Sequence, residues 1–253
     1  MTELSPENEE RITGCGKLVA AAIFLLGLGY LAILPPFEGF DETAHYSGMR
    51  QIAYTGTIPL RGHSFIDRFV ERYQQNAPMP WGSGSPPFDR TGSMTYPSFF
   101  ADRLAVENYK VYRSVAAEKF APSSFENWEW QHPPLYYLFM APLVLLTAPL
   151  PFATQIFILR TVSYLLAFTG FLAGWIAVRT FAGKTIPYGI ATGYLFYPMI
   201  APMFFPEFAR LGNDSLCLFI LGITCIFSLR FFYGDESEKK KRWPSAPAWA
   251  RGY

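Results

Sequence analysis

Five apolar segments constrain the fold of this chain more than any other feature of its sequence. They cover about 17–34, 135–151, 155–178, 186–205 and 214–233. A transmembrane α-helix needs roughly 20 mostly apolar residues to cross the hydrocarbon core of a bilayer. Only 16% of the residues are charged, compared with roughly 25% in ordinary soluble domains. The sequence therefore predicts an all-α, multi-pass membrane protein with about five transmembrane helices.

The composition also excludes other classes of protein. The net charge of +1 gives no overall basic surface that would attract nucleic acid, so we expect no nucleic-acid partner. The three cysteines, Cys15, Cys217 and Cys225, lie beside or inside apolar segments and predict no disulfide framework. We interpret them as small, buried hydrophobic residues.

The apolar segments divide the chain into five parts. These are an N-terminal segment, a first transmembrane helix, a long loop, a bundle of about four apolar segments and a basic tail, at 1–16, 17–36, 37–133, 134–233 and 234–253. Arg11 and Lys17 favour a cytoplasmic N-terminus, which places the long loop outside. A cleaved signal peptide is the alternative for the first apolar segment. The acidic leader and the lack of a small-residue cleavage site before Pro35 argue against it.

The long loop contains too many aromatic residues for a disordered linker, and a loop of this length is expected to be functional. Its pattern predicts a helix at 40–55 that ends at Gly56, and a second helix at 99–120. We place both helices along the membrane surface. The apolar face of the second helix includes Leu104, Val111 and Val115. An interfacial aromatic belt is expected at Trp128, Trp130, Tyr136 and Tyr137.

The basic cluster at 239–242 conflicts with strict alternation of five spans, which would place it outside. A bent or re-entrant segment at 135–151 would resolve the conflict. It would put 207–214 on the same side as the long loop. It would also put the basic residues Arg11 and Lys17 and the basic cluster at 239–242 inside. Five prolines in and before this segment favour that interpretation: Pro133, Pro134, Pro142, Pro149 and Pro151. The sequence is compatible with both topologies.

The first candidate motif, PPFEGFDETAHY at 35–46, directly follows the first apolar segment. On a helix, Asp41 and His45 would share one face. A carboxylate here suits a general base that acts on an acceptor hydroxyl, or a ligand of a divalent cation, with Asp41 and Glu42 as the candidates. The alternative is that Asp41 and Glu42 cap a surface helix and complement its dipole.

The second motif, WEWQHPPLYY at 128–137, holds His132 extended before two prolines, where it could donate to a phosphate or sugar oxygen. The alternative is a proline-started helix with an incidental histidine. Arg160 is a lone charge in an apolar segment, and it is either a head-group contact or a snorkelling side chain at a helix end.

The third motif, EFARLGNDS at 207–215, places Glu207, Arg210 and Asp214 on one helical face between two apolar segments. Arg210 could bind a phosphate through two hydrogen bonds. The alternative is an internal ion pair at a helix end. Asn213 begins a glycosylation acceptor pattern, but it lies too close to the bilayer for modification to be expected.

In this order, the motifs PPFEGFDETAHY, QHPPLYY and RLGNDSL resemble those of the GT-C superfamily of integral-membrane glycosyltransferases. The likeness is greatest to bacterial members related to protein O-mannosyltransferases and lipid A aminoarabinose transferases. It covers about residues 17–233. It implies a polyprenyl-phosphate sugar donor, an extracytoplasmic acceptor and a location in the bacterial inner membrane, as part of the cell envelope.

The resemblance also implies roles for particular residues. Asp41, with Glu42 beside it, takes the catalytic position in the first external loop. His132, Arg210, Asn213 and Asp214 match later motifs of the family and are expected to bind substrate. His45 and Arg160 join the expected substrate-binding residues from their own positions in the sequence, not from the resemblance. Some family members bind a divalent cation and others need none, so Asp41 and Glu42 are also the candidate metal ligands.

Family members generally have more spans than this chain. The alternatives are therefore a truncated fragment, or a non-catalytic subunit completed by a second membrane chain that supplies further helices. Part of a transporter or flippase is a weaker alternative, because the sequence shows no internal repeat.

Overall fold

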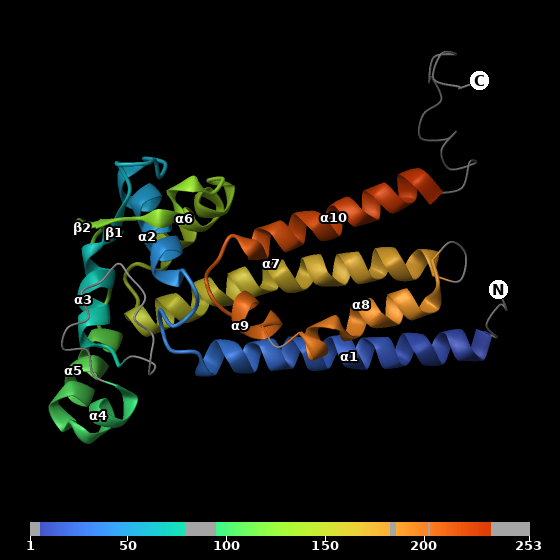
Figure 1. The fold of residues 1–253 in the computed structure, drawn as a ribbon, viewed down its shortest axis with the longest axis horizontal. Helices are drawn as coiled ribbons and strands as arrows, with labels where there is room; N and C mark the ends of the chain where they lie inside the picture. The colour runs from blue at the N-terminus through green and yellow to red at the C-terminus, as the bar shows by residue number, and fades with distance from the viewer. Residues whose placement is uncertain (1–5, 79–94, 183–185, 202, 234–253) are drawn as a thin grey trace, which may run out of the picture. The chain divides into compact units, whose positions relative to one another are not determined.

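The computed structural model describes residues 6–78, 95–182, 186–201 and 203–233, and this part of the chain is mostly helical (Figure 1). Its elements in chain order are α1 (Pro6–Ile33), α2 (Glu42–Thr55), β1 (Phe65–Asp67), α3 (Arg68–Asn76), α4 (Tyr96–Ala101), α5 (Arg103–Ser114), β2 (Pro122–Glu126), the 3₁₀ helix η1 (Trp128–Gln131), α6 (Leu135–Thr147), α7 (Phe152–Phe181), α8 (Tyr188–Ile200), α9 (Phe204–Phe208) and α10 (Asp214–Tyr233). The basic cluster at 239–242 lies outside the described residues.

Three helices in the described residues are long and apolar enough to cross a membrane: Gly14–Ile33 within α1, α7 and α10. The other two apolar segments form α6 and α8, which have 13 residues each and include Pro142 and Pro198. A helix of that length falls short of the hydrocarbon thickness. The structure therefore supports a helical membrane protein with three candidate spanning helices in its described residues, and the prediction of five complete spans is not confirmed.

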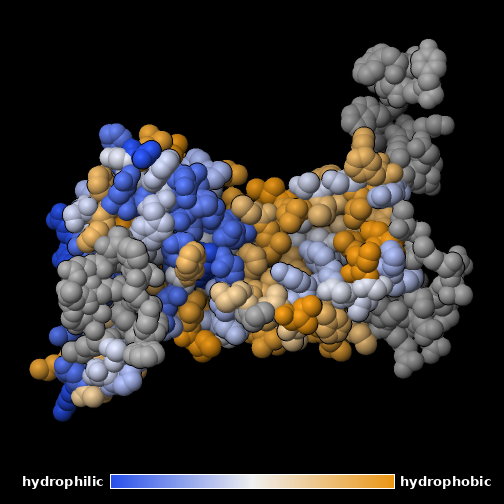
Figure 2. Space-filling view, viewed as in Figure 1, coloured by the Kyte–Doolittle hydropathy of each residue, from blue (hydrophilic) through white to orange (hydrophobic). Residues whose placement is uncertain are grey.

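One compact unit consists of residues 1–25, 166–202 and 216–253, and its surface is largely hydrophobic (Figure 2). Within it, α7 contacts three other helices. Phe168 packs against Phe24 of α1, with ring centroids 5.1 Å apart, and Phe171 stacks on Tyr194 of α8 at 5.3 Å. Gly170 lies against the backbone of α10, where a Cβ atom would clash. Such close backbone approach at small residues is typical of helix packing in membranes.

The cysteines do not lie where the sequence predicts. Cys15 and Cys217 are exposed, and Cys225 is half-exposed. The prediction of buried cysteines is wrong, because these residues lie on the outward, lipid-type faces of long apolar helices rather than in a core.

The second compact unit consists of residues 26–165 and 203–215. The predicted helix at 40–55 is confirmed as α2, and Gly56 ends it in the left-handed conformation (φ 68°) with its N–H on the carbonyl of Ile52. α2 is buried from Glu42 to Ile52 against α6, β1 and η1. Its place along the membrane surface stays a prediction.

The second predicted helix is split into α4 and α5, because Asp102 caps a new helix through the N–H groups of Leu104 and Ala105. None of the residues of α5 is buried, and its place along the membrane surface stays a prediction. The small antiparallel sheet of β1 and β2 was not expected in an all-α chain. It pairs two segments of the long loop that are far apart in the sequence.

The long loop has a core of its own. The ring of Phe37 packs against Tyr46, Tyr73 and Phe152, with centroids between 5.3 and 5.5 Å away. Beside this cluster, the fully buried Arg50 forms an ion pair with Asp67. The loop is therefore a packed domain, and it holds the residues that follow the first spanning helix in fixed positions.

Candidate functional site

Arg160 of α7 binds the backbone just beyond the C-terminal end of α1, the first spanning helix. Its guanidinium donates to the carbonyls of Leu34 and Pro35, which follow the last residue of α1. It also forms a two-point ion pair with Glu42, with N–O distances of 2.7 and 2.5 Å. Only 2% of Arg160 is exposed. The structure therefore places Arg160 as an internal anchor rather than at a surface open to lipid head groups or substrate.

Glu42 lies at the centre of this anchor and is fully buried. Besides Arg160, its oxygens accept the backbone N–H groups of Phe37 (2.8 Å) and Leu211 (3.0 Å). Four hydrogen bonds thus join three separate segments of the chain at one carboxylate. Glu42 has no face open to a substrate, unlike its neighbour Asp41.

Asp41 occupies the N-cap position of α2 but does not cap it through its side chain. Its backbone is left-handed (φ 55°), which is uncommon for a residue other than glycine. The carboxylate instead accepts the indole N–H of Trp128, with Nε1 and Oδ1 2.7 Å apart. The capping alternative therefore does not hold for Asp41. Its half-exposed carboxylate is instead held by a partner 87 positions along the chain.

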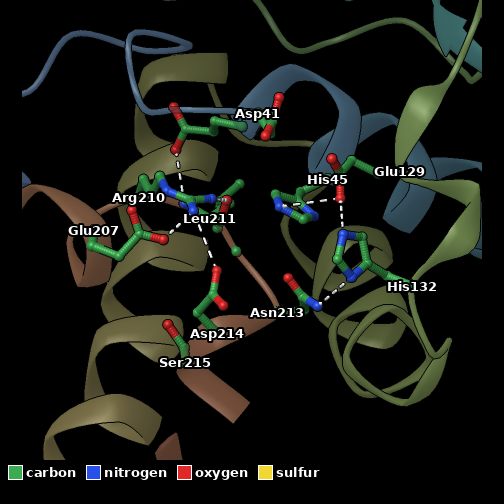
Figure 3. Close-up of polar contacts among 12 residues, drawn as sticks. Asp41, His45, Glu129, His132, Glu207, Arg210, Leu211, Asn213, Asp214 and Ser215 are labelled. Atoms are coloured by element: carbon green, nitrogen blue, oxygen red, sulfur yellow. Dashed lines mark hydrogen bonds and ion pairs between the residues drawn. The ribbon is translucent and has the colours of Figure 1, made fainter. Parts of the chain in front are cut away.

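A second polar cluster lies beside Asp41 and contains His45, Glu129, His132 and Asn213 (Figure 3). Glu129 and His132 form an ion pair at 2.6 Å, and Asn213 lies 3.0 Å from the other ring nitrogen of His132. Asn213 is buried here, which agrees with the expectation that it is not glycosylated. His132 is the accessible member, since 35% of its side chain is exposed.

His45 is buried and contacts Tyr137 at 2.9 Å through Nδ1. Burial, together with the positive charges of Arg210 and His132, lowers the pKa of His45 to about 3. Burial raises the pKa of Glu129, and the positive charge of His132 opposes that rise. His45 is therefore neutral at physiological pH and too deep to touch a substrate. It supports Glu129, whose carboxylate lies 3.9 Å from its Nε2.

Arg210 forms the third part of the site. It donates to Glu207 and, at 3.3 Å, to Asp214, so the internal ion pair considered from the sequence is present. The three residues do not share one helix, because α9 ends at Phe208 and α10 begins at Asp214. Gly39 packs directly on Arg210: a Cβ atom at residue 39 would lie 2.5 Å from the Cβ of Arg210. The segment before Asp41 and the 207–214 segment are thus held together.

Asp41 and Glu42 do not form a binding site for a divalent cation. Both oxygens of Glu42 already accept hydrogen bonds. Within the ranges that the structure describes, no three His, Cys, Asp or Glu side chains are grouped to hold a metal ion. The donor set therefore does not fit the metal that some GT-C members bind.

Three residues of the site were missed by sequence reasoning: Glu38, Trp128 and Glu129. Trp128 and Glu129 lie inside the second motif, but the pattern there indicated an aromatic belt and drew attention to His132 alone. Their partners are far away in the sequence, so only the folded loop brings them to Asp41 and His45. Glu38 lies inside the first motif. The motif contains this third carboxylate close to Asp41 and Glu42, and that proximity could have identified it.

Burial raises the pKa of Glu38 to about 7; the charge of Arg160 opposes this rise and that of Glu42 adds to it. A carboxyl whose pKa is raised on folding destabilises the folded state as pH rises from its ordinary value of 4.5 to about 7. We expect Glu38→Gln to be more stable than wild type at pH 8 by about 1 kcal/mol, after allowance for partial exposure, and equal to it at pH 4.5. Thermal unfolding in detergent between pH 4.5 and 8 measures this. The exposed Glu107→Gln variant is the control, and a Glu38→Gln curve parallel to wild type would contradict the prediction.

Comparison with family models, curated proteins and solved structures found no match. The site is therefore interpreted from its own geometry.

Proposed function

We propose that this protein is a membrane glycosyltransferase of the GT-C type, which transfers a sugar from a polyprenyl-phosphate donor to an extracytoplasmic acceptor. The observation that carries the proposal is the position of Asp41. Its carboxylate is half-exposed, held by a hydrogen bond from Trp128, and eight residues beyond the end of a helix suited to cross a membrane. A lipid-linked donor presents its reactive head group at that depth.

In the proposed reaction, Asp41 takes the proton from the acceptor hydroxyl. The hydroxyl oxygen attacks C1 of the sugar, the bond between C1 and the phosphate oxygen breaks, and polyprenyl phosphate leaves. The proton passes from Asp41 to solvent. Leaving-group charge is best stabilised by fixed donors. His132, whose side chain is 35% exposed, would supply one by exchanging Glu129 for the phosphate at its Nε2. Arg210 would reach the phosphate only by giving up Asp214, which is half-exposed.

The contacts of the 207–214 segment support one of the two topologies. Leu211 donates to Glu42, and Gly39 packs on Arg210, so this segment lies beside the start of the long loop. The short α6 fits a segment that does not cross the bilayer completely. We therefore propose that the site lies on the extracytoplasmic side, with the N-terminus inside. The resemblance to GT-C members adds the inner membrane of a bacterium as the proposed location.

The test is transfer from polyprenyl-phosphate sugars by membranes that contain wild type or Asp41→Asn. Asparagine tolerates the left-handed backbone and keeps an oxygen for Trp128, so this change removes little besides the charge and basicity. We expect activity to fall by roughly 10²- to 10⁴-fold, while Glu107→Gln remains fully active. Full activity of Asp41→Asn would contradict the role of Asp41. Absence of transfer by folded wild type would favour a non-catalytic subunit or a fragment that needs a second membrane chain.

A further inference from the structure

The indole of Trp128 makes a contact that the proposed reaction does not by itself require. The short hydrogen bond from its Nε1 to Oδ1 of Asp41 spans 2.7 Å between a half-buried ring and a half-exposed carboxylate. The described residues donate no hydrogen bond to the second oxygen of Asp41, Oδ2. One oxygen is therefore held and the other is left open.

The backbone that carries Trp128 is itself fixed to α2. Asn127, which is 1% exposed, donates its side-chain amide to the carbonyl of Ala44 at 2.9 Å. Its backbone N–H donates to Ser64, and its side-chain oxygen caps η1 through the N–H of Glu129. Ala44 lies three residues after Asp41. The hydrogen bond between Asn127 and Ala44 therefore fixes the backbone that carries Trp128 to the backbone that carries Asp41.

Glu129, which follows Trp128 in η1, belongs to the second polar cluster. Glu129 pairs with His132 at 2.6 Å, while Trp128 binds Asp41. One short 3₁₀ helix thus controls the orientation of a carboxylate on one side and an imidazole on the other. Preorganised groups of this kind are held by neighbours whose own positions are locked.

We propose that Trp128 is a positioning residue for Asp41: its N–H holds Oδ1 and leaves Oδ2 to face the acceptor hydroxyl. The role of Asp41 as the base rests on the proposed function.

The first measurement needs no transferase activity. Dicyclohexylcarbodiimide reacts with carboxyl groups, so peptide mass spectrometry after treatment of the full chain at a single pH measures how far Asp41 is labelled. Trp128→Phe keeps an aromatic ring and loses the N–H. We expect several-fold more labelling of Asp41, because the indole no longer holds its Oδ1. The matched control is Trp130→Phe, since the ring of Trp130 lies near Arg61 at 5.9 Å and should leave the labelling of Asp41 unchanged.

The second measurement is transfer. Trp128→Phe should lower kcat by roughly 10- to 100-fold with little change in KM. Equal labelling of Asp41 in the two phenylalanine variants would overturn the proposal, as would increased labelling with an unchanged kcat. If folded wild type transfers no sugar, the proposed function fails, and the extent of labelling alone then decides whether Trp128 controls Asp41.

Discussion

Glu42→Gln is expected to lower the free energy of unfolding by about 3–5 kcal/mol, because it leaves the charge of Arg160 buried without its partner. The ion pair is 0% and 2% exposed at its two side chains. The change also weakens the acceptor for the N–H groups of Phe37 and Leu211. Three segments would therefore loosen together: the end of the first spanning helix, the start of α2 and the 207–214 segment.

The exposed pair of Glu107 and Lys110 provides the matched control. Its N–O distance is 3.0 Å, but its side chains are 57% and 65% exposed, and such pairs contribute about 0.5 kcal/mol or less. Denaturant unfolding of the purified protein in detergent compares Glu42→Gln with Glu107→Gln. Equal losses in the two variants would show that the buried pair is not an anchor. Transfer activity is expected to fall in Glu42→Gln as well, since Asp41 directly precedes Glu42 and its position depends on the same start of α2.

The sequence predicts helices better than it predicts which residues meet. Glycine at position 56 and the apolar pattern before it were sufficient to predict α2, because both signals are local. The expectation of five spans is not confirmed, because α6 and α8, with 13 residues each, are shorter than the hydrocarbon core of a bilayer requires. Pro142 and Pro198 lie within the two short helices that were counted as spans.

The candidate site shows the same division between local and long-range information. The three motifs were found from the sequence, and the structure brings residues from all of them together. The different roles of neighbouring residues within a motif were not predictable from the sequence. Glu42 and Asp41 are adjacent and chemically alike, but one binds Arg160 at a distance of 118 positions and the other binds Trp128. Burial by distant segments, rather than residue type, distinguishes the internal anchor from the accessible carboxylate.

Asp67→Asn is expected to destabilise the long loop by about 3–5 kcal/mol, again by isolating a buried cation. Arg50 is 0% exposed, and its other hydrogen bonds go to the carbonyl of Glu118 and the hydroxyl of Tyr46 at 3.5 Å. The neighbouring rings of Tyr46, Tyr54 and Phe69 carry no charge that could replace that of Asp67. Asparagine keeps an oxygen that can accept the N–H of Phe69 and so preserves the cap of α3. The expected loss therefore comes from the charge and not from the cap.

The exposed pair of Arg72 and Glu118 in the same region supplies the control, since its side chains are 43% and 64% exposed. Hydrogen exchange of the full chain in detergent should show faster exchange across α2, β1 and β2 in Asp67→Asn, but not in Glu118→Gln. Because α7 and α10 hold each other by backbone contacts near Gly170, their exchange should remain slow in both variants. Equal protection of α2 in the two variants would mean that the ion pair of Arg50 and Asp67 does not hold the loop. Loss of protection in α2 alone would show that the site depends on a loop core that can open while the helices α7 and α10 remain packed.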